Sequence, residues 1–290
     1  MDWSKAKNII IAAFVITNLF LIFFISRGML TKGDLQLITP EYITYVANYL
    51  NENGITVKTE VPTEILSLPV IEVKYESFDP DEMAASLLGV PNSLVGTDHY
   101  KSGDKELIIE DGKRLKFNDY SDRKEIYSFD ESNIEEYVTN FLTEHELIRD
   151  NLQLSQIHLE NDYSKDSIPT YKLVYNQTYK GRFLGESYIY VYVNNKGVVA
   201  LEAMLLNYQR TYSHKKLTIT ATDALLRKMS DISRENSSRV AIINIELGYY
   251  FDPYDVQETD LKSIEFADAF PAWKITLDNG KEYYVEAIKN

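Results

Sequence analysis

Residues 9–25, IIIAAFVITNLFLIFFI, set the architecture of the chain. Thr17 and Asn18 are their only polar members, and none of them is charged. As an α-helix that rises about 1.5 Å per residue, this stretch extends roughly 26 Å, close to the hydrocarbon thickness of about 30 Å in a bilayer. Its Ile, Leu, Phe and Val residues each favour insertion by about 0.3–0.6 kcal/mol. We therefore expect a transmembrane signal anchor over residues 9–27 that meets the lipid bilayer through residues 9–25.

The alternative is a cleaved signal peptide, in which an apolar region of about 7–15 residues ends at a small-residue cleavage site. Residues 26–30, SRGML, show no such A-x-A pattern, which favours a retained anchor. Basic residues flank the span almost equally, so they orient it weakly. A tail of residues 1–8 before a large remainder favours a cytoplasmic N-terminus. We thus expect a single-pass cell-membrane protein with an extracellular ectodomain.

Asn18 is an amide near the centre of this span. In lipid it bonds either a neighbouring helix or its own helix backbone, and interhelical bonds of this kind contribute about 0.6 kcal/mol on average. Ala13 and Thr17 are small enough to let a second helix approach closely. We hypothesise that a face containing Ala13, Thr17 and Asn18 contacts a partner helix.

The rest of the chain is strongly acidic. The 290 residues carry a net charge of −14, and because residues 1–32 hold +3, the remainder holds −17. Such a surface repels nucleic acid and anionic lipid headgroups, so no nucleic-acid partner is expected. The chain contains no cysteine, which excludes disulfides, Cys-zinc sites and a thiol nucleophile. The remainder of about 258 residues, together with the hydrophobic content of the chain, suffices for two domains.

After a linker over residues 28–38, helices and hairpins alternate. Capping residues and apolar periodicity predict helices over 40–53, from Pro80 to about 89, from Ser132 to 142, and from Thr220. Alternating or apolar runs predict strands over 68–75, 107–109, 115–117, 125–129, 152–159, 170–175, 188–193, 198–206, 240–251, 272–277 and 282–288. The expected fold class is α+β, an ectodomain of two helix-plus-antiparallel-sheet units over residues 39–130 and 131–290.

One predicted strand has two chemically different faces. Residues 188–193, YIYVYV, alternate tyrosine with aliphatic side chains, and successive side chains of a strand point to opposite faces. The tyrosine face is either half-buried beneath a helix or a binding platform for a peptide or glycan. The pattern favours the packed face.

Catalytic and metal-binding signatures are missing. The four histidines lack the spacing of a zinc site, and each is expected at the surface or half-buried. There is no G-x-S-x-G motif, no phosphate-binding glycine loop and no G-x-G-x-x-G. Residues 161–166, NDYSKD, offer oxygen ligands but include a lysine and lack the EF-hand glycine, which argues against calcium. We expect no enzymatic activity, no catalytic residues, no metal and no cofactor.

Several short motifs together resemble one family. The chain begins MDWSKAK directly before the span, its ectodomain is acidic and cysteine-free, and GYYF (248–251), PAWK (271–274) and YYVEA (283–287) follow near the end. In this order the motifs resemble the YycI (WalI) family over essentially the whole chain. The related YycH proteins begin similarly but are considerably longer.

The resemblance implies a Gram-positive membrane protein whose bulk lies outside the cell. Members of the family act with YycH on the sensor histidine kinase WalK of the WalK/WalR two-component system, partly through transmembrane helices, and so tune cell-wall metabolism. It also implies an ectodomain like the C-terminal part of YycH and supplies no catalytic residues. The alternative function is a membrane-tethered cell-wall glycan-binding protein or hydrolase that uses carboxylates or the tyrosine face.

Overall fold

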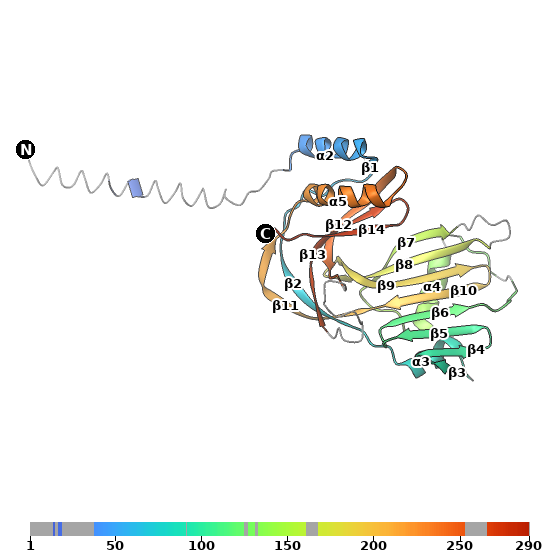
Figure 1. Cartoon of the computed structure of the whole chain (residues 1–290). Coiled ribbons are helices and arrows are strands. Elements are labelled where there is room, and N and C mark those ends of the chain that lie inside the picture. The colour runs from blue at the N-terminus through green and yellow to red at the C-terminus, as the bar shows by residue number, and fades with distance from the viewer. Residues whose placement is uncertain are drawn as a thin grey trace, which may run out of the picture. The chain divides into compact units, whose positions relative to one another are not determined.

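The computed structural model describes residues 14, 17–18, 38–90, 92–124, 127–130, 133–160, 168–252 and 266–289. It divides the chain into two compact units, Met1–Tyr45 and Val46–Asn290. The fold is α+β, with four helices and a large sheet among these residues (Figure 1). None of those helices has the length and apolar character that membrane crossing requires. Apart from residues 14, 17, 18 and 38, the predicted tail, anchor and linker lie outside the described ranges.

The helices follow the sequence prediction closely. They are α2 (Pro40–Glu52), α3 (Pro80–Leu88), α4 (Ile134–Glu144) and α5 (Ala221–Glu235). Asp79 caps α3, because its side chain accepts hydrogen bonds from the backbone N–H groups of residues 81 and 82. Thr220 caps α5 by accepting from the N–H of Asp223 at 3.0 Å. The cap predicted for α4, Ser132, lies outside the described residues.

The middle of the chain forms one antiparallel sheet. Its strands lie in the order β3-β4-β5-β6-β10-β9-β8-β7, so that hairpins supply most neighbours and β10 joins the two groups. Their bounds are β3 (Ser93–Gly96), β4 (His99–Ser102), β5 (Lys105–Glu110), β6 (Arg114–Asp119), β7 (Leu152–Glu160), β8 (Thr170–Tyr179), β9 (Arg182–Asn194) and β10 (Gly197–Met204). We call these strands the central sheet.

The remaining strands come from both sides of the central sheet in the sequence. They are β1 (Ile55–Val57), β2 (Ser67–Tyr75), β11 (Leu206–Leu217), β12 (Val240–Tyr250), β13 (Phe266–Leu277) and β14 (Glu282–Glu286). β13 pairs with β2, β12 and β14, while β1 joins β12 and β11 joins β2. A parallel bridge between Tyr249 of β12 and Leu184 of β9 links them to the central sheet (Figure 1). Residue 130 is therefore not a boundary of the hydrogen-bonded sheet.

The prediction of a strand over residues 125–129 is wrong for its described part. Residues 127–129 form no strand, and 125–126 lie outside the description. Instead the Tyr127 and Phe129 rings stack on each other and contact the ring of Tyr137 on α4, with centroids 4.8–5.0 Å from it. Tyr127 and Phe129 thus pack on a helix. Their alternation in the sequence resembles the pattern of a strand, although it arises from this tertiary contact. The sequence also missed β1, β3 and β4, and the turn of the chain from β10 into β11.

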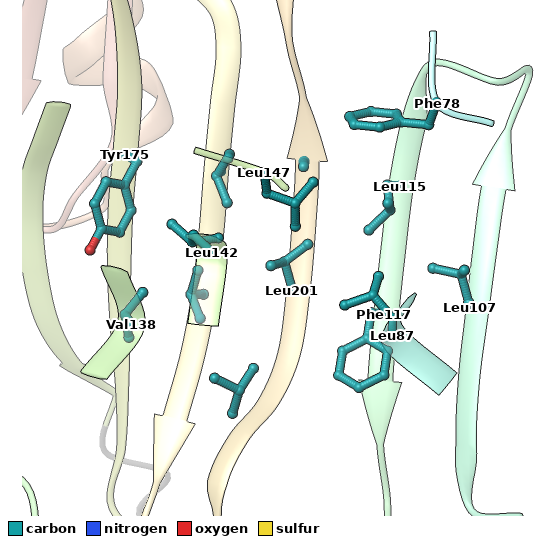
Figure 2. Packing of buried hydrophobic residues seen from close by; sticks show 14 of the residues in the cluster. Phe78, Leu87, Leu107, Leu115, Phe117, Val138, Leu142, Leu147, Tyr175 and Leu201 are labelled. Carbon is teal, nitrogen blue, oxygen red and sulfur yellow. The ribbon is translucent and has the colours of Figure 1, made fainter. Parts of the chain in front are cut away.

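The main core lies between the central sheet and helices α3 and α4 (Figure 2). One cross-strand row shows how it is built, because neighbouring strands present apolar residues at the same level, in the order Leu107, Phe117, Leu201, Val191 and Leu173. Leu87 of α3 and Val138 and Leu142 of α4 bury their side chains in the same cluster. Full burial of each such side chain stabilises the fold by about 1.5–3 kcal/mol.

Two glycines permit the close approach of β9 and β12. A Cβ on Gly185 would lie 2.6 Å from Cδ2 of Tyr250, and a Cβ on Gly248 would overlap the ring and the carbonyl oxygen of Phe183. Glycine leaves room for the Tyr250 ring at residue 185, and for the Phe183 ring and backbone at residue 248. Gly248 of the GYYF motif therefore allows β12 to lie against β9 of the central sheet.

Candidate functional site

The two faces of β9 are separated as the alternating sequence predicts. Ile189, Val191 and Val193 are fully buried and belong to the core that α4 covers. Tyr188, Tyr190 and Tyr192 are half-buried on the opposite face, which we call the tyrosine face. The expected half-burial of the tyrosines is confirmed, but α4 packs on the aliphatic face and not over them. The turn between β13 and β14 lines a common groove with Tyr190.

Neighbouring strands extend the tyrosine face with polar residues. On β8, Lys172 pairs with Tyr192, and on β7, His158 pairs with Lys172. The rings of Tyr188 and Tyr190 stack with centroids 4.3 Å apart, and Lys172 Nζ lies 4.4 Å from the Tyr190 centroid. At this distance a cation is attracted by the negative face of the ring. The tyrosine face therefore combines aromatic surface with a positioned cation.

A groove of about 650 Å³ lies between this face and the β13–β14 turn. Three strands of the central sheet form one side, and residues that follow β13 form the other. The lining residues are Gln156, His158, Leu159, Glu160, Lys172, Val174, Tyr190, Asp278, Asn279, Gly280 and Glu282. Most of them carry hydrogen-bonding side chains, which makes this an unusually polar ligand-sized groove, since such sites are mostly apolar.

The β14 side of the groove contains a buried charge cluster. Lys274 is 3% exposed, and its Nζ lies 2.9 Å from Glu246 and 3.5 Å from Glu282. The hydroxyl of Tyr284 donates to the same Glu282 carboxylate at 2.7 Å. A buried ammonium needs such partners because an unpaired charge in the interior is costly. Glu282 is thus held in place and its charge is offset by the PAWK lysine.

The hydroxyls of Tyr188 and Tyr190 remain protonated at neutral pH. Burial raises the pKa of Tyr190 well above its ordinary value, and the nearby carboxylates of Glu282 and Glu202 raise it further. Burial also raises the pKa of Tyr188, whose hydroxyl donates to Glu202 at 2.8 Å. Both hydroxyls therefore act as hydrogen-bond donors at neutral pH.

Glu186 lies two residues before Tyr188 on β9. It is a titratable residue that no sequence pattern indicated. Burial, and then repulsion from Asp252, raises the pKa of its carboxyl to about 7, while Arg114 opposes the shift. Its backbone φ is 61°, a left-handed conformation that is uncommon for residues other than glycine. No sequence motif marks it, because its burial arises where β9 meets β12.

The four histidines are half-buried or exposed, as predicted. His158 lies in the groove and contacts Gln156. His145 lies on another part of the chain, and its Nδ1 is 2.8 Å from the hydroxyl of Ser86, a residue distant from it in the sequence. Burial lowers the pKa of His145. Among the described residues no three His, Asp or Glu side chains gather as a metal site. The calcium candidate at residues 161–166 lies outside the description.

Two of the three residues proposed for helix contact are described. Thr17 and Asn18 have helical backbone, and Ala13 lies outside the description. The side-chain amide of Asn18 donates to the carbonyl oxygen of Phe14 at 2.9 Å. An asparagine amide carries a second N–H and an acceptor oxygen, so this bond leaves capacity for further hydrogen bonds.

Comparison with known proteins bears on the family. A family model described as YycI protein matches residues 36–288. The chain belongs to the YycI family. The resemblance found in the sequence is confirmed. YycI is a regulatory family, and membership supports a regulatory role in the WalK system. A search of curated protein sequences finds no match.

Solved structures share the fold. YycH from Bacillus subtilis has a TM-score of 0.53 and 15% identity; the match covers 77% of this chain and 53% of that one, so this chain spans about half of the YycH structure. An uncharacterized protein from Eubacterium rectale has a TM-score of 0.50 and 12% identity, with coverage of 85% and 97%. At these identities the likenesses show the fold alone, which agrees with the expected YycH-like architecture.

Sequence reasoning found Tyr190, the tyrosine that lines the groove, but missed the groove itself. Period-two alternation over 156–160 was available as a signal, since it places Gln156, His158 and Glu160 on one strand face. Strand pairing then sets Lys172 beside them. The β13–β14 turn comes from a segment roughly ninety residues downstream of the tyrosines, and no local pattern links the two.

Proposed function

We propose that this protein is a non-enzymatic, membrane-anchored regulator of the sensor histidine kinase WalK that acts together with YycH. Membership of the YycI family carries this proposal. A YycH-like fold supports it, because two proteins of one architecture are suited to one regulatory assembly. The expected location is the cell membrane of a Gram-positive bacterium, with the N-terminus in the cytoplasm and the ectodomain outside.

The membrane contribution of this proposal rests on residues 9–25. A kinase that signals across a membrane switches between two packing arrangements of its transmembrane helices. A neighbouring helix shifts the equilibrium between these arrangements only if it binds one of them more tightly than the other. Ala13, Thr17 and Asn18 offer close approach and hydrogen bonding on such a helix. The ectodomain then positions the span through extracytoplasmic contacts with WalK and YycH.

The decisive experiment exchanges residues 9–25 for an unrelated apolar helix of equal length in the intact protein. We expect normal membrane insertion, loss of co-purification with WalK and loss of its effect on WalK-dependent transcription. Asn18→Leu is the finer variant, and Ser26→Leu at the edge of the span is its matched control. Full activity after the exchange would refute the membrane part of the proposal.

A second measurement separates regulation from catalysis. The intact protein, purified from solubilised membranes, is incubated with peptidoglycan, and the products are analysed by mass spectrometry. We expect unchanged glycan. Turnover of peptidoglycan would favour the membrane-tethered hydrolase and overturn the non-enzymatic assignment.

A further inference from the structure

We propose that the groove between the tyrosine face and the β13–β14 turn binds an uncharged oligosaccharide. This inference concerns a ligand site and does not rest on the proposed regulation of WalK.

The groove has the size and construction of a ligand site. Its volume of about 650 Å³ falls in the range of about 300–1,000 Å³ that small-molecule sites occupy. Two of its sides belong to different parts of the chain, the central sheet and the turn after β13. A site bounded by paired strands is held in position better than one on loops alone.

The lining matches the surface of a sugar. Gln156, Lys172 and the hydroxyl of Tyr190 donate hydrogen bonds, while Glu160 and Asp278 accept them. Sugar hydroxyls do both, so they pair with a lining that mixes donors and acceptors. Leu159, Val174 and the edge of the tyrosine ring add apolar surface for the C–H groups of a pyranose. A predominantly apolar ligand would leave these polar groups without partners, which is costly.

Charge decides which sugar polymer fits. The lining carries the carboxylates of Glu160, Asp278 and Glu282 against one lysine ammonium, so a phosphate-rich polymer would be repelled. Glu282 is already engaged by Lys274 and Tyr284. The other two carboxylates remain as acceptors for neutral hydroxyl and amide groups, which favours an uncharged, N-acetylated or plain oligosaccharide.

Lys172 is the donor best placed to meet such a ligand. Among the residues that the structure describes, its ammonium contacts the faces of Tyr190 and Tyr192 and forms no ion pair with a carboxylate. Cation–π contact holds the ammonium above the rings while leaving its N–H groups able to donate. The stacked ring of Tyr188 supports Tyr190 from beside it.

The turn side of the groove is also preorganised. Asn279 accepts a hydrogen bond from the N–H of Lys281 and donates to Asn236 beyond α5. Asp278 accepts from the N–H of Ala241 at 3.0 Å. A turn tied down in this way loses little conformational entropy when a ligand binds, which raises affinity.

The test measures binding of chitotetraose, an uncharged oligosaccharide, to the full-length chain by isothermal titration calorimetry. The protein is kept in a zwitterionic detergent, because a detergent with a sugar headgroup would compete. The variants are Lys172→Met and Glu160→Gln, which keep side-chain length or shape, and Lys215→Met on the exposed strand β11 is the matched control. Thermal unfolding verifies that each variant is folded.

We expect saturable binding by the wild type and by Lys215→Met, and affinity at least about tenfold weaker in both groove variants, as follows from loss of one charged hydrogen bond. No binding to the wild type at millimolar chitotetraose would overturn the proposal. So would equal affinity in folded groove variants, or a preference for an oligomer of glycerol phosphate used as the anionic competitor.

Discussion

The two faces of β9 consist of alternating residues of one strand, yet they differ in burial and in what packs against them. Ile189, Val191 and Val193 are 0% exposed beneath α4, whereas the tyrosines that alternate with them are half-buried, and Tyr190 among them lines a polar groove. The aliphatic face is closed by α4, which buries Ile134, Val138 and Leu142 in the same core. The tyrosine face is approached by a turn that presents carboxylates and amides. A tyrosine suits this boundary because its ring is apolar and its hydroxyl needs a polar partner.

The difference separates stability from recognition within one strand. Residues on the aliphatic face contribute to the core, where any polar substitution is expensive. Residues on the tyrosine face make single hydrogen bonds and ring contacts, which contribute less each and leave room for a ligand. Substitutions across β9 should therefore fall into two classes of effect.

The largest effect is expected for Val191→Asp. It places a carboxylate in the core without a partner and should lower the free energy of unfolding by about 3–5 kcal/mol. The matched control is Tyr192→Asp, one residue on and on the other face, where Lys172 lies opposite. Urea denaturation followed by far-UV circular dichroism measures both. Equal losses would contradict the distinction between the faces.

Gly248→Ala should disturb the junction that brings the outer strands against β9. Its Cβ would overlap Phe183, and we expect a loss of about 3 kcal/mol. Gly96→Ala on β3 has its nearest atom at 3.8 Å, so it should change stability by less than about 0.5 kcal/mol. Thermal unfolding compares the two. A well-tolerated Gly248→Ala would mean that β9 and β12 can separate without cost.

Glu186→Gln should make stability less dependent on pH. The folded pKa of Glu186 is about 7 and the unfolded value is 4.5, so the folded state binds the proton more tightly. Below about pH 4.5 both states are protonated and nothing is lost, whereas the ionised carboxyl is destabilising above about pH 7.

The wild type should therefore lose stability relative to Glu186→Gln as the pH rises from 4.5 to 7, by about 3 kcal/mol at pH 8. Urea denaturation of both proteins at pH 5 and pH 8 measures this difference. A gap that is the same at both pH values would show that the Glu186 carboxyl does not titrate in this window.

The smallest effect is expected for Tyr188→Phe. This change removes the hydroxyl that donates to Glu202 and should cost about 1 kcal/mol. Tyr192→Phe is the control, since among the described residues its hydroxyl makes no hydrogen bond, and we expect it to be neutral. Chemical denaturation resolves the pair. A neutral Tyr188→Phe would show that the tyrosine face contributes to stability through its rings alone.

The elements that sequence reasoning found share short-range causes. Asp79 and Thr220 begin helices through hydrogen bonds within three residues, and Asp111-Gly112 turns a hairpin because both residues adopt positive φ. The alternation in β9 separates its two faces whatever the rest of the chain does. The error at residues 125–129 has the opposite cause, since Tyr127 and Phe129 alternate like a strand but pack on a helix.

The sequence by itself determined the α+β pattern, the aliphatic and tyrosine faces of β9 and the family, because periodicity, caps and short motifs are properties of neighbouring residues. Only the tertiary structure decided which face the helix covers, the burial of Glu186 and the groove beside Lys172. Those features depend on strands that pair across long sequence separations, as β2 does with β13 and β12 with β9. Such pairings depend on the packing of the whole sheet, and a local sequence pattern does not predict them.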